Sequence, residues 1–285
     1  MNIWNTMIMT NMKNSNLYPI LFVHGMGFHD SKLISYWGRI PGVFENKGVP
    51  VYYGYQDSNA DIETNGLHIA NRIDEIIKES GAEKLHIIAH SKGGLDCRYA
   101  ISALGKGNKV ASLTTISTPH NGSKTVDLLM QLPDPLVRFA GFCTDCVFRV
   151  LGDKNPNSYK VFHSFTTKEA RAFNEKYVNH ENVYYQSYAF VMKNAFSDIF
   201  MCIPNLVVSF VEGENDGLLT PEAVKWGDFK GVYRGTGRRG ISHCDEVDMR
   251  RRAFSKKMGN GVSDILEIYE EIYTTLSELK MPTTI

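Results

Sequence analysis

The stretch L-H-I-I-A-H-S-K-G-G-L-D-C-R-Y at residues 85–99 places a serine where it could act as a nucleophile. The residues before Ser91 form an apolar run with β-branched members, which is typical of a strand buried on both faces of a parallel sheet. The residues after it are typical of a helix. Ala89 and Gly93 stand two positions before and after the serine, and such small residues allow a tight strand-to-helix turn that exposes the hydroxyl. The alternative is an ordinary strand-to-helix turn, because this pentapeptide pattern also arises by chance.

A nucleophilic serine needs a base that takes its proton and an acid that orients the base. Asp216 follows the segment L-V-V-S-F-V at 206–211, which we interpret as a strand, and is the candidate acid. His243 follows a short strand predicted around residues 232–233, and is the candidate base. Serine, acid and histidine occur in this order, each after a strand, in α/β-hydrolases. The alternative for Asp216 is a hairpin turn, since Asp-Gly is common there.

Two backbone N–H groups could stabilise the charge that develops on a carbonyl oxygen under attack. A strand candidate, Y-P-I-L-F-V at 18–23, leads into H-G-M-G at 24–27, where glycines let the backbone approach a substrate closely. We predict that the N–H groups of Met26 and Lys92, the latter at a helix start, form the oxyanion hole. Alternatively, the glycines only turn the chain.

Strand and helix patterns alternate along the first 120 residues or so of the chain. Further strands are predicted at 51–55 and 110–116, and the spacing of isoleucines predicts a helix over 61–78. This alternation favours an α/β fold, namely the α/β-hydrolase fold with a mostly parallel central sheet flanked by helices, in one domain over 1–285. An amphipathic helix over 262–279 closes the domain.

The character of the sequence changes between residues 124 and 205, which we interpret as a helical cap or lid inserted in the domain. Two apolar segments, 126–132 and 136–151, are separated by two prolines and predict a pair of helices. Such a cap would present an apolar surface to an acyl chain or to a lipid interface. The alternative is a pair of helices packed permanently on the core or on a second subunit.

Composition excludes several classes of function. Basic and acidic residues number 31 each, so no net positive charge attracts nucleic acid. No apolar run approaches the ~20 residues of a transmembrane helix. Residues 1–16 lack an export-signal pattern and the five cysteines suggest no disulfide framework, so a cytoplasmic protein is expected. Secretion by another route is the alternative. A zinc or redox role for the C-x-x-C at 143–146 is an alternative that lacks a second ligand pair.

The assembled motifs resemble those of the bacterial triacylglycerol lipase family. The resemblance rests on five blocks in order: Y-P-I-L-F-V-H-G-M-G at 18–27, A-H-S-K-G-G-L-D-C-R-Y at 89–99, T-I-S-T-P-H-N-G-S at 115–123, E-N-D-G-L at 214–218 and H-C-D-E-V at 243–247. It implies hydrolysis of acyl ester or lipid substrates by a Ser91–Asp216–His243 triad, with no cofactor in the chemistry. Alternatives on the same fold are a short-chain carboxylesterase, a thioesterase and a non-catalytic acyl-ligand binding protein.

The resemblance also implies a structural calcium ion near the catalytic histidine. Many members bind it with an aspartate two residues after that histidine, matched by Asp245, and with another upstream of the acid, for which Asp198 is the candidate. A further oxygen ligand expected four residues beyond Asp245 is replaced by Met249. Calcium takes six to eight oxygen ligands.

Overall fold

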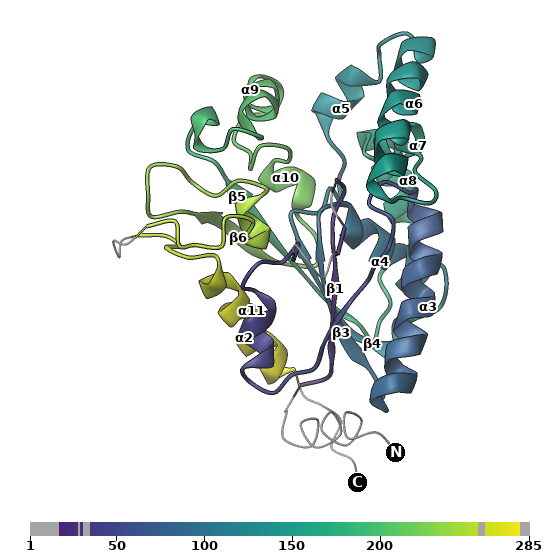
Figure 1. Cartoon of the computed structure of the whole chain (residues 1–285), viewed down its shortest axis with the longest axis vertical. Helices are drawn as coiled ribbons and strands as arrows, with labels where there is room; N and C mark the ends of the chain where they lie inside the picture. The colour runs from purple at the N-terminus through teal and green to yellow at the C-terminus, as the bar shows by residue number, and fades with distance from the viewer. Residues whose placement is uncertain (1–16, 28, 31–34, 256–259, 280–285) are drawn as a thin grey trace.

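Six parallel strands form the central sheet of the computed structural model (Figure 1). The structure describes residues 17–27, 29, 30, 35–255 and 260–279, so the stretch examined for an export signal lies outside the described residues. The strand order is β2-β1-β3-β4-β5-β6, and every neighbouring pair is parallel. The strands are β1 Ile20–Val23, β2 Val51–Tyr53, β3 Leu85–His90, β4 Val110–Ile116, β5 Tyr184–Val191 and β6 Asp228–Arg234. Because the strands are parallel, all their carboxyl ends lie at one edge of the sheet.

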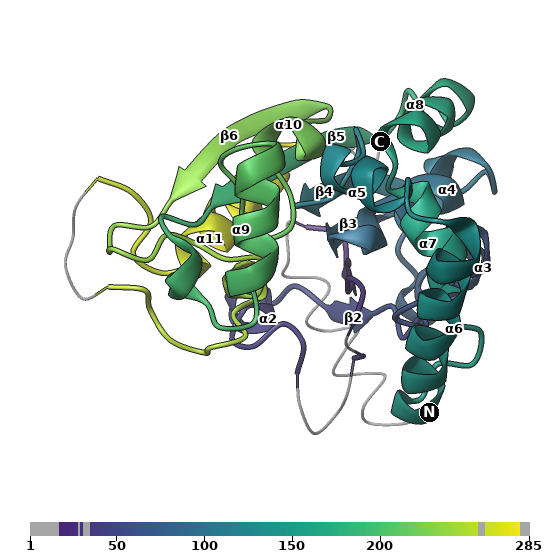
Figure 2. The same ribbon diagram turned by 90° about the horizontal axis from the view of Figure 1, so that it is seen from above.

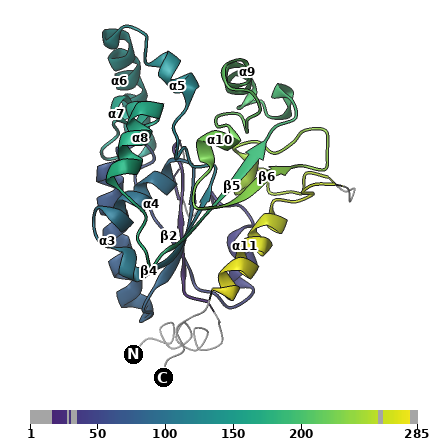
Figure 3. The same ribbon diagram turned by 180° about the vertical axis from the view of Figure 1, so that it is seen from behind.

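Helices cover both faces of this sheet (Figures 1 and 3). One face packs against α3 Ile62–Ser80 and α4 Lys92–Ser102, and the other against α2 Pro41–Glu45 and α11 Leu266–Glu278. Successive side chains of a strand point to opposite faces. In β1, for example, Leu21 belongs to the first core and Phe22 to the second. Both cores need apolar residues, which explains the continuous apolar runs of β1 and β3.

The first four strands and the long crossover helix predicted from the sequence are confirmed, with small changes at their ends. The helix predicted over 61–78 is α3. Its start is set by Asp61, whose side chain accepts a hydrogen bond from the Thr64 N–H, and it ends at Gly81 in the left-handed conformation. The last helix, α11, begins at Leu266, four residues after the start predicted at residue 262.

The strand predicted at 206–211 is wrong. This segment belongs to the helix α9 Cys202–Val211, and the fifth strand of the sheet is β5. A run of apolar β-branched residues is typical of a buried strand, yet most of the side chains of α9 face away from the core. By contrast, β5 carries polar residues such as Gln186, whose side chain donates to Thr114 on β4. Tertiary contacts of this kind hide a buried strand from a search for apolar runs.

The predicted insertion 124–205 therefore contains a strand of the central sheet. Before β5 it forms a group of helices above the carboxyl edge, seen from above in Figure 2. These are α5 Lys124–Leu129, α6 Asp134–Leu151, α7 Ser158–Ser164 and α8 Thr167–Lys176. The loop after α6 is tied to the core, since the buried Asp153 carboxylate accepts the N–H groups of Ser58 and Asn59 at 2.8 Å. None of the described helices is long and apolar enough to cross a membrane.

Short elements complete the chain around the carboxyl edge. The helix α10 Pro221–Val224 packs on β5, and three short 3-10 helices lie at Gly107–Lys109, Ala195–Ser197 and Asp245–Val247. All five cysteines are free, and those at 143 and 146 are exposed on α6.

We expect His86 to make stability depend on pH. Burial in β3 lowers the pKa of His86 from 6.5 to about 4. Between these values the unfolded chain binds one proton more than the folded chain, so the free energy of unfolding falls as pH falls. His86→Asn should remove this contribution, about 1.4 kcal/mol per pH unit. Urea denaturation between pH 7 and pH 4 measures the free energy of unfolding of the wild type and of the variant. An equal dependence of this free energy on pH in both proteins would contradict the expectation.

Candidate active site

Ser91 occupies a strained turn between β3 and α4. Its backbone has φ 52° and ψ −132°, an unfavourable combination for a residue with a side chain. Neighbouring segments hold it there, because the Ser91 N–H donates to the Ile116 carbonyl at 2.9 Å and the Thr118 hydroxyl donates to the Ser91 carbonyl at 2.7 Å. A Cβ atom on Gly93 would lie 2.4 Å from the His24 carbonyl oxygen, so the sequence needs glycine at this close approach.

His243 and Asp216 meet beside this turn. Nδ1 of the His243 ring lies 2.8 Å from Oδ2 of Asp216, and the His243 N–H donates to the Asp216 carbonyl at 2.8 Å. The other oxygen of Asp216 accepts the N–H groups of Leu218 and Leu219, each at 2.8 Å. Both oxygens of the carboxylate are therefore fixed, and the carboxylate in turn fixes the imidazole.

These contacts keep Asp216 ionised although it is fully buried. Burial by itself raises the pKa of a carboxyl group, but the His243 ring and the N–H donors of Leu218 and Leu219 outweigh it, and the net pKa is lowered. A carboxylate at Nδ1 places the ring proton on that nitrogen. Nε2 is then unprotonated and able to accept a proton.

One pocket of about 410 Å³ brings three of the predicted site residues together. Ser91, His243 and Met26 all line it. The rest of its wall is largely apolar and includes Val126, Phe162, Phe165, Met201, Leu218, Leu219, Val247 and Met249. The pocket thus joins a hydroxyl, an imidazole and a glycine-containing loop to a surface suited to hydrocarbon.

The two predicted oxyanion donors belong to segments that adjoin the serine. Lys92 is the first residue of α4, and its side chain forms an ion pair with Asp96 inside the fold at 2.7 Å. The loop of Met26 packs directly on the turn, because a Cβ atom on Gly25 would lie 2.7 Å from the Cβ of Ser91. Nitrogens at a helix start and in an adjoining tight loop suit stabilisation of an oxyanion.

A buried chain of hydrogen bonds behind the pocket was not predicted as a unit. The Tyr36 hydroxyl accepts from the Gly25 N–H at 3.1 Å and lies 2.7 Å from Nδ1 of His90. Nε2 of His90 lies 3.2 Å from Oε2 of Glu246. The His90 ring also packs on the His243 ring, with centroids 4.4 Å apart. The chain links the oxyanion loop to the candidate base.

Glu246 is the residue that sequence reasoning missed. Burial, followed by the negative charge of Asp216, raises its pKa well above the usual value, so it is a neutral acid. Burial likewise lowers the pKa of His90, with His243 adding to the effect, so His90 is neutral too. The available signal was an acidic residue three positions after the candidate histidine, inside a motif already noted.

Asp198 and Asp245, the predicted calcium ligands, are also brought together. Both are buried, and Arg250 contacts them both, at 3.1 Å and 2.7 Å. Among the described residues, one group of side chains is close enough to share a metal ion, and it consists of His90, His243 and Glu246. The hydrogen bonds and ring contact above already engage these three side chains.

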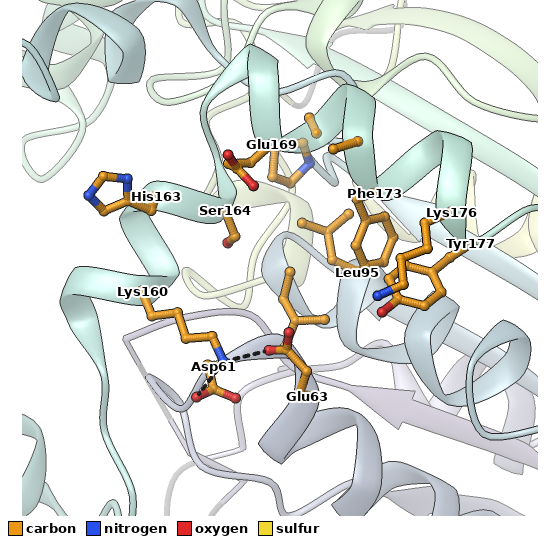
Figure 4. Close-up of a pocket in the computed structure, with 14 residues that line it drawn as sticks. Asp61, Glu63, Leu95, Lys160, His163, Ser164, Glu169, Phe173, Lys176 and Tyr177 are labelled. Atoms are coloured by element: carbon orange, nitrogen blue, oxygen red, sulfur yellow. Dashed lines mark ion pairs between the residues drawn. The ribbon is translucent and has the colours of Figure 1, made fainter.

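A second pocket, of about 260 Å³, lies away from the serine between the cap helices α7 and α8 and the start of α3 (Figure 4). Lys160 on α7 forms ion pairs there with Asp61 at 3.4 Å and Glu63 at 3.0 Å. These pairs attach the cap to the core, and we assign the pocket no chemistry.

Comparisons with known proteins identify a family and a fold for this chain. A family model described as palmitoyl protein thioesterase matches residues 19–233. Triacylglycerol lipase 2 of Saccharomyces cerevisiae is 29% identical over 230 residues, 77% of this chain and 64% of that protein. A triacylglycerol lipase of Vibrio cholerae is 33% identical over 113 residues, 39% of this chain and 36% of that protein. The chain thus spans less than two thirds of either relative.

A solved structure supports the fold independently of these names. The lipase of Staphylococcus hyicus superposes with a TM-score of 0.65 at 16% identity, over 93% of this chain and 96% of that chain. Together with the parallel sheet, this likeness confirms the predicted α/β-hydrolase fold.

We expect the two variants of Glu246 to differ. Glu246→Gln keeps an oxygen that accepts from His90 and should change the free energy of unfolding little. Glu246→Ala leaves the buried His90 N–H without its acceptor and should cost about 1–3 kcal/mol. Urea unfolding at pH 7 measures the difference, with the same two substitutions at exposed Glu222 as controls. Equal stability of the Gln and Ala variants at 246 would contradict a hydrogen-bonding role.

Proposed function

The chain belongs to the palmitoyl protein thioesterase family of α/β-hydrolases, and from this premise we propose that it is a serine hydrolase of carboxylic esters. Triacylglycerols are the proposed substrate class, in line with the names of its curated relatives. The observation that carries the proposal is the single apolar pocket lined by both a strained serine and a carboxylate-oriented histidine.

The proposed reaction has two steps. His243 Nε2 takes the Ser91 proton as the hydroxyl oxygen attacks the ester carbonyl, and the protonated ring then gives that proton to the leaving alcohol. An acyl-enzyme remains on Ser91. Water, deprotonated by the same histidine, cleaves this acyl-enzyme and releases the acid. Asp216 stabilises the imidazolium in both steps, and the N–H groups of Met26 and Lys92 bind the oxyanion.

The shape and lining of the pocket favour a hydrocarbon chain over a small polar acid. Its wall contains phenylalanine, leucine, valine and methionine side chains from the core and from the cap. Each buried CH₂ contributes about 0.8 kcal/mol to binding, so the pocket rewards longer chains. This supports long acyl esters against the short-chain carboxylesterase alternative.

We further propose that the cap region contacts the lipid surface. Exposed apolar side chains stand on α5, α6 and α9, and Figures 1 and 2 place these helices above the carboxyl edge of the sheet. We call this set the apolar rim. Its members are Leu128, Leu129, Leu136, Phe139, Phe142, Val147, Val150, Leu151, Ile203, Leu206, Val207 and Phe210. Many exposed apolar side chains near a site that accepts hydrocarbon suit a lipid interface.

Thioester hydrolysis is the second candidate, and the description of the matched family favours it. The same nucleophile, base and oxyanion donors serve both reactions, because the two substrates share the carbonyl under attack and differ in the leaving group. A long acyl chain fits the pocket in either case. The substrates therefore have to be compared directly.

We expect Ser91→Ala to lower kcat on p-nitrophenyl esters by at least about a thousandfold, since the variant lacks the oxygen that attacks. In the wild type, kcat/KM should rise with acyl length from acetate to palmitate. Palmitoyl thioesters, matched in chain length, test the second candidate. Turnover by the alanine variant equal to that of wild type would refute the mechanism, and acyl-ligand binding without product release would support a non-catalytic protein.

We expect Phe210→Asp, at the apolar rim, to weaken action on emulsified triacylglycerol by about tenfold or more, because burying one phenylalanine in lipid contributes about 1.5–3 kcal/mol. Phe210 is 93% exposed. Hydrolysis of a water-soluble short ester should not change. Val178→Asp is the control, since Val178 is apolar and 66% exposed but lies outside the rim. Equal losses in both variants would argue against a docking surface.

A further inference from the structure

A cluster of buried charges braces the loop that carries His243. Oδ2 of Asp198 accepts the Ser242 hydroxyl at 2.7 Å, and Oδ2 of Asp245 accepts the Ser242 N–H at 3.2 Å. The two carboxylates thus hold the residue immediately before the candidate base. Both are nearly excluded from solvent, at 4% and 3% exposure. Two negative charges so placed need a cation between them.

Arg250 supplies that cation. Its Nη2 donates to Oδ2 of Asp198 at 3.1 Å and to the Ser197 carbonyl at 2.9 Å. Its Nε lies 2.7 Å from Oδ1 of Asp245. The fork of the guanidinium lets one side chain bridge two carboxylates, which the point charge of a lysine does less well.

The oxygen atoms around Asp198 and Asp245 do not suit the calcium ion that the resemblance to lipases implies. The remaining oxygen of Asp198 accepts the Phe200 N–H at 3.0 Å, so three of the four carboxylate oxygens accept hydrogen bonds. The fourth, Oδ1 of Asp245, accepts no hydrogen bond but is ion-paired with Nε of Arg250 at 2.7 Å. A pocket of about 380 Å³ is lined by Asp245 and Arg250. Two further arginines, Arg239 and Arg252, line this pocket too, and their charges disfavour a second cation. Calcium takes six to eight oxygens, and Met249 stands where another ligand is expected.

We propose that Arg250 is a built-in replacement for the structural calcium ion and positions His243. The guanidinium joins the segment of Asp198 to the loop of Asp245, and this junction fixes Ser242 and the histidine after it. The protein then needs no metal to keep its base in place. Arg250 is a positioning residue, since it acts through the loop, and its effect on catalysis rests on the proposed ester hydrolysis.

The first experiment compares the wild-type protein in EDTA and in millimolar calcium. Its melting temperature and its kcat should be the same in both. A calcium-dependent rise in melting temperature, or a loss of kcat in EDTA that calcium reverses, would overturn the proposal. The melting measurement does not need activity, so an inactive wild type would refute the proposed function and leave this comparison intact.

The second experiment removes the cation. Arg250→Ala should melt at a lower temperature than the wild type in EDTA, because two buried carboxylates lose the cation that pairs with them. Its kcat should fall about tenfold to a hundredfold with KM little changed, since the histidine is misplaced while the acyl pocket is intact. Arg250→Lys, which keeps a charge, should recover part of kcat.

The control is Arg252→Ala, since Arg252 is exposed and lines the same pocket. It should melt like the wild type and show no response to calcium. If Arg250→Ala yields no folded protein, Arg250→Lys takes its place in the melting comparison, where a melting temperature below that of wild type in EDTA is expected. A variant at 250 that melts and turns over like the wild type would overturn the proposal.

Discussion

The site depends on a backbone conformation that Ser91 would not adopt alone. A positive φ at a residue with a side chain costs of order 1–3 kcal/mol, and the surrounding structure must supply that energy. Hydrogen bonds from β4 and from the loop after it offset this cost, since they engage both the N–H and the carbonyl group of Ser91. The sheet and α4 then enforce the turn, and the hydroxyl projects toward the pocket as a result.

Charged side chains inside the fold are paired with opposite charges around this turn. Lys92 forms an ion pair with Asp96, and Asp216 forms one with His243. Arg250 forms ion pairs with both Asp198 and Asp245. The groups between these pairs are kept neutral by burial, as with His90 and Glu246. The low dielectric of the interior makes each arrangement rigid, since breaking a pair would leave an unpaired charge.

Much of the fold and of the candidate site could be predicted from the sequence because its signals are local. Adjacent residues specify the turn at Ser91, the apolar runs of β1 and β3 and the caps of α3. Helix α9 was wrongly predicted as a strand, and strand β5 was not predicted at all, because β5 is held by distant contacts such as the Gln186 amide that donates to Thr114 on β4. The roles of Glu246 and Arg250 were not predicted for the same reason, since their partners His90 and Asp198 lie far away in the sequence.

The apolar rim has a consequence for the protein in dilute buffer. Side chains such as Phe210 and Val150 are almost fully wetted there, at 93% and 87% exposure, and water disfavours them wherever another apolar surface is within reach. In a purified sample without amphiphiles, the nearest such surface is another copy of the same molecule. Reversible clustering that grows with concentration and disperses in mild detergent is therefore the expected solution behaviour.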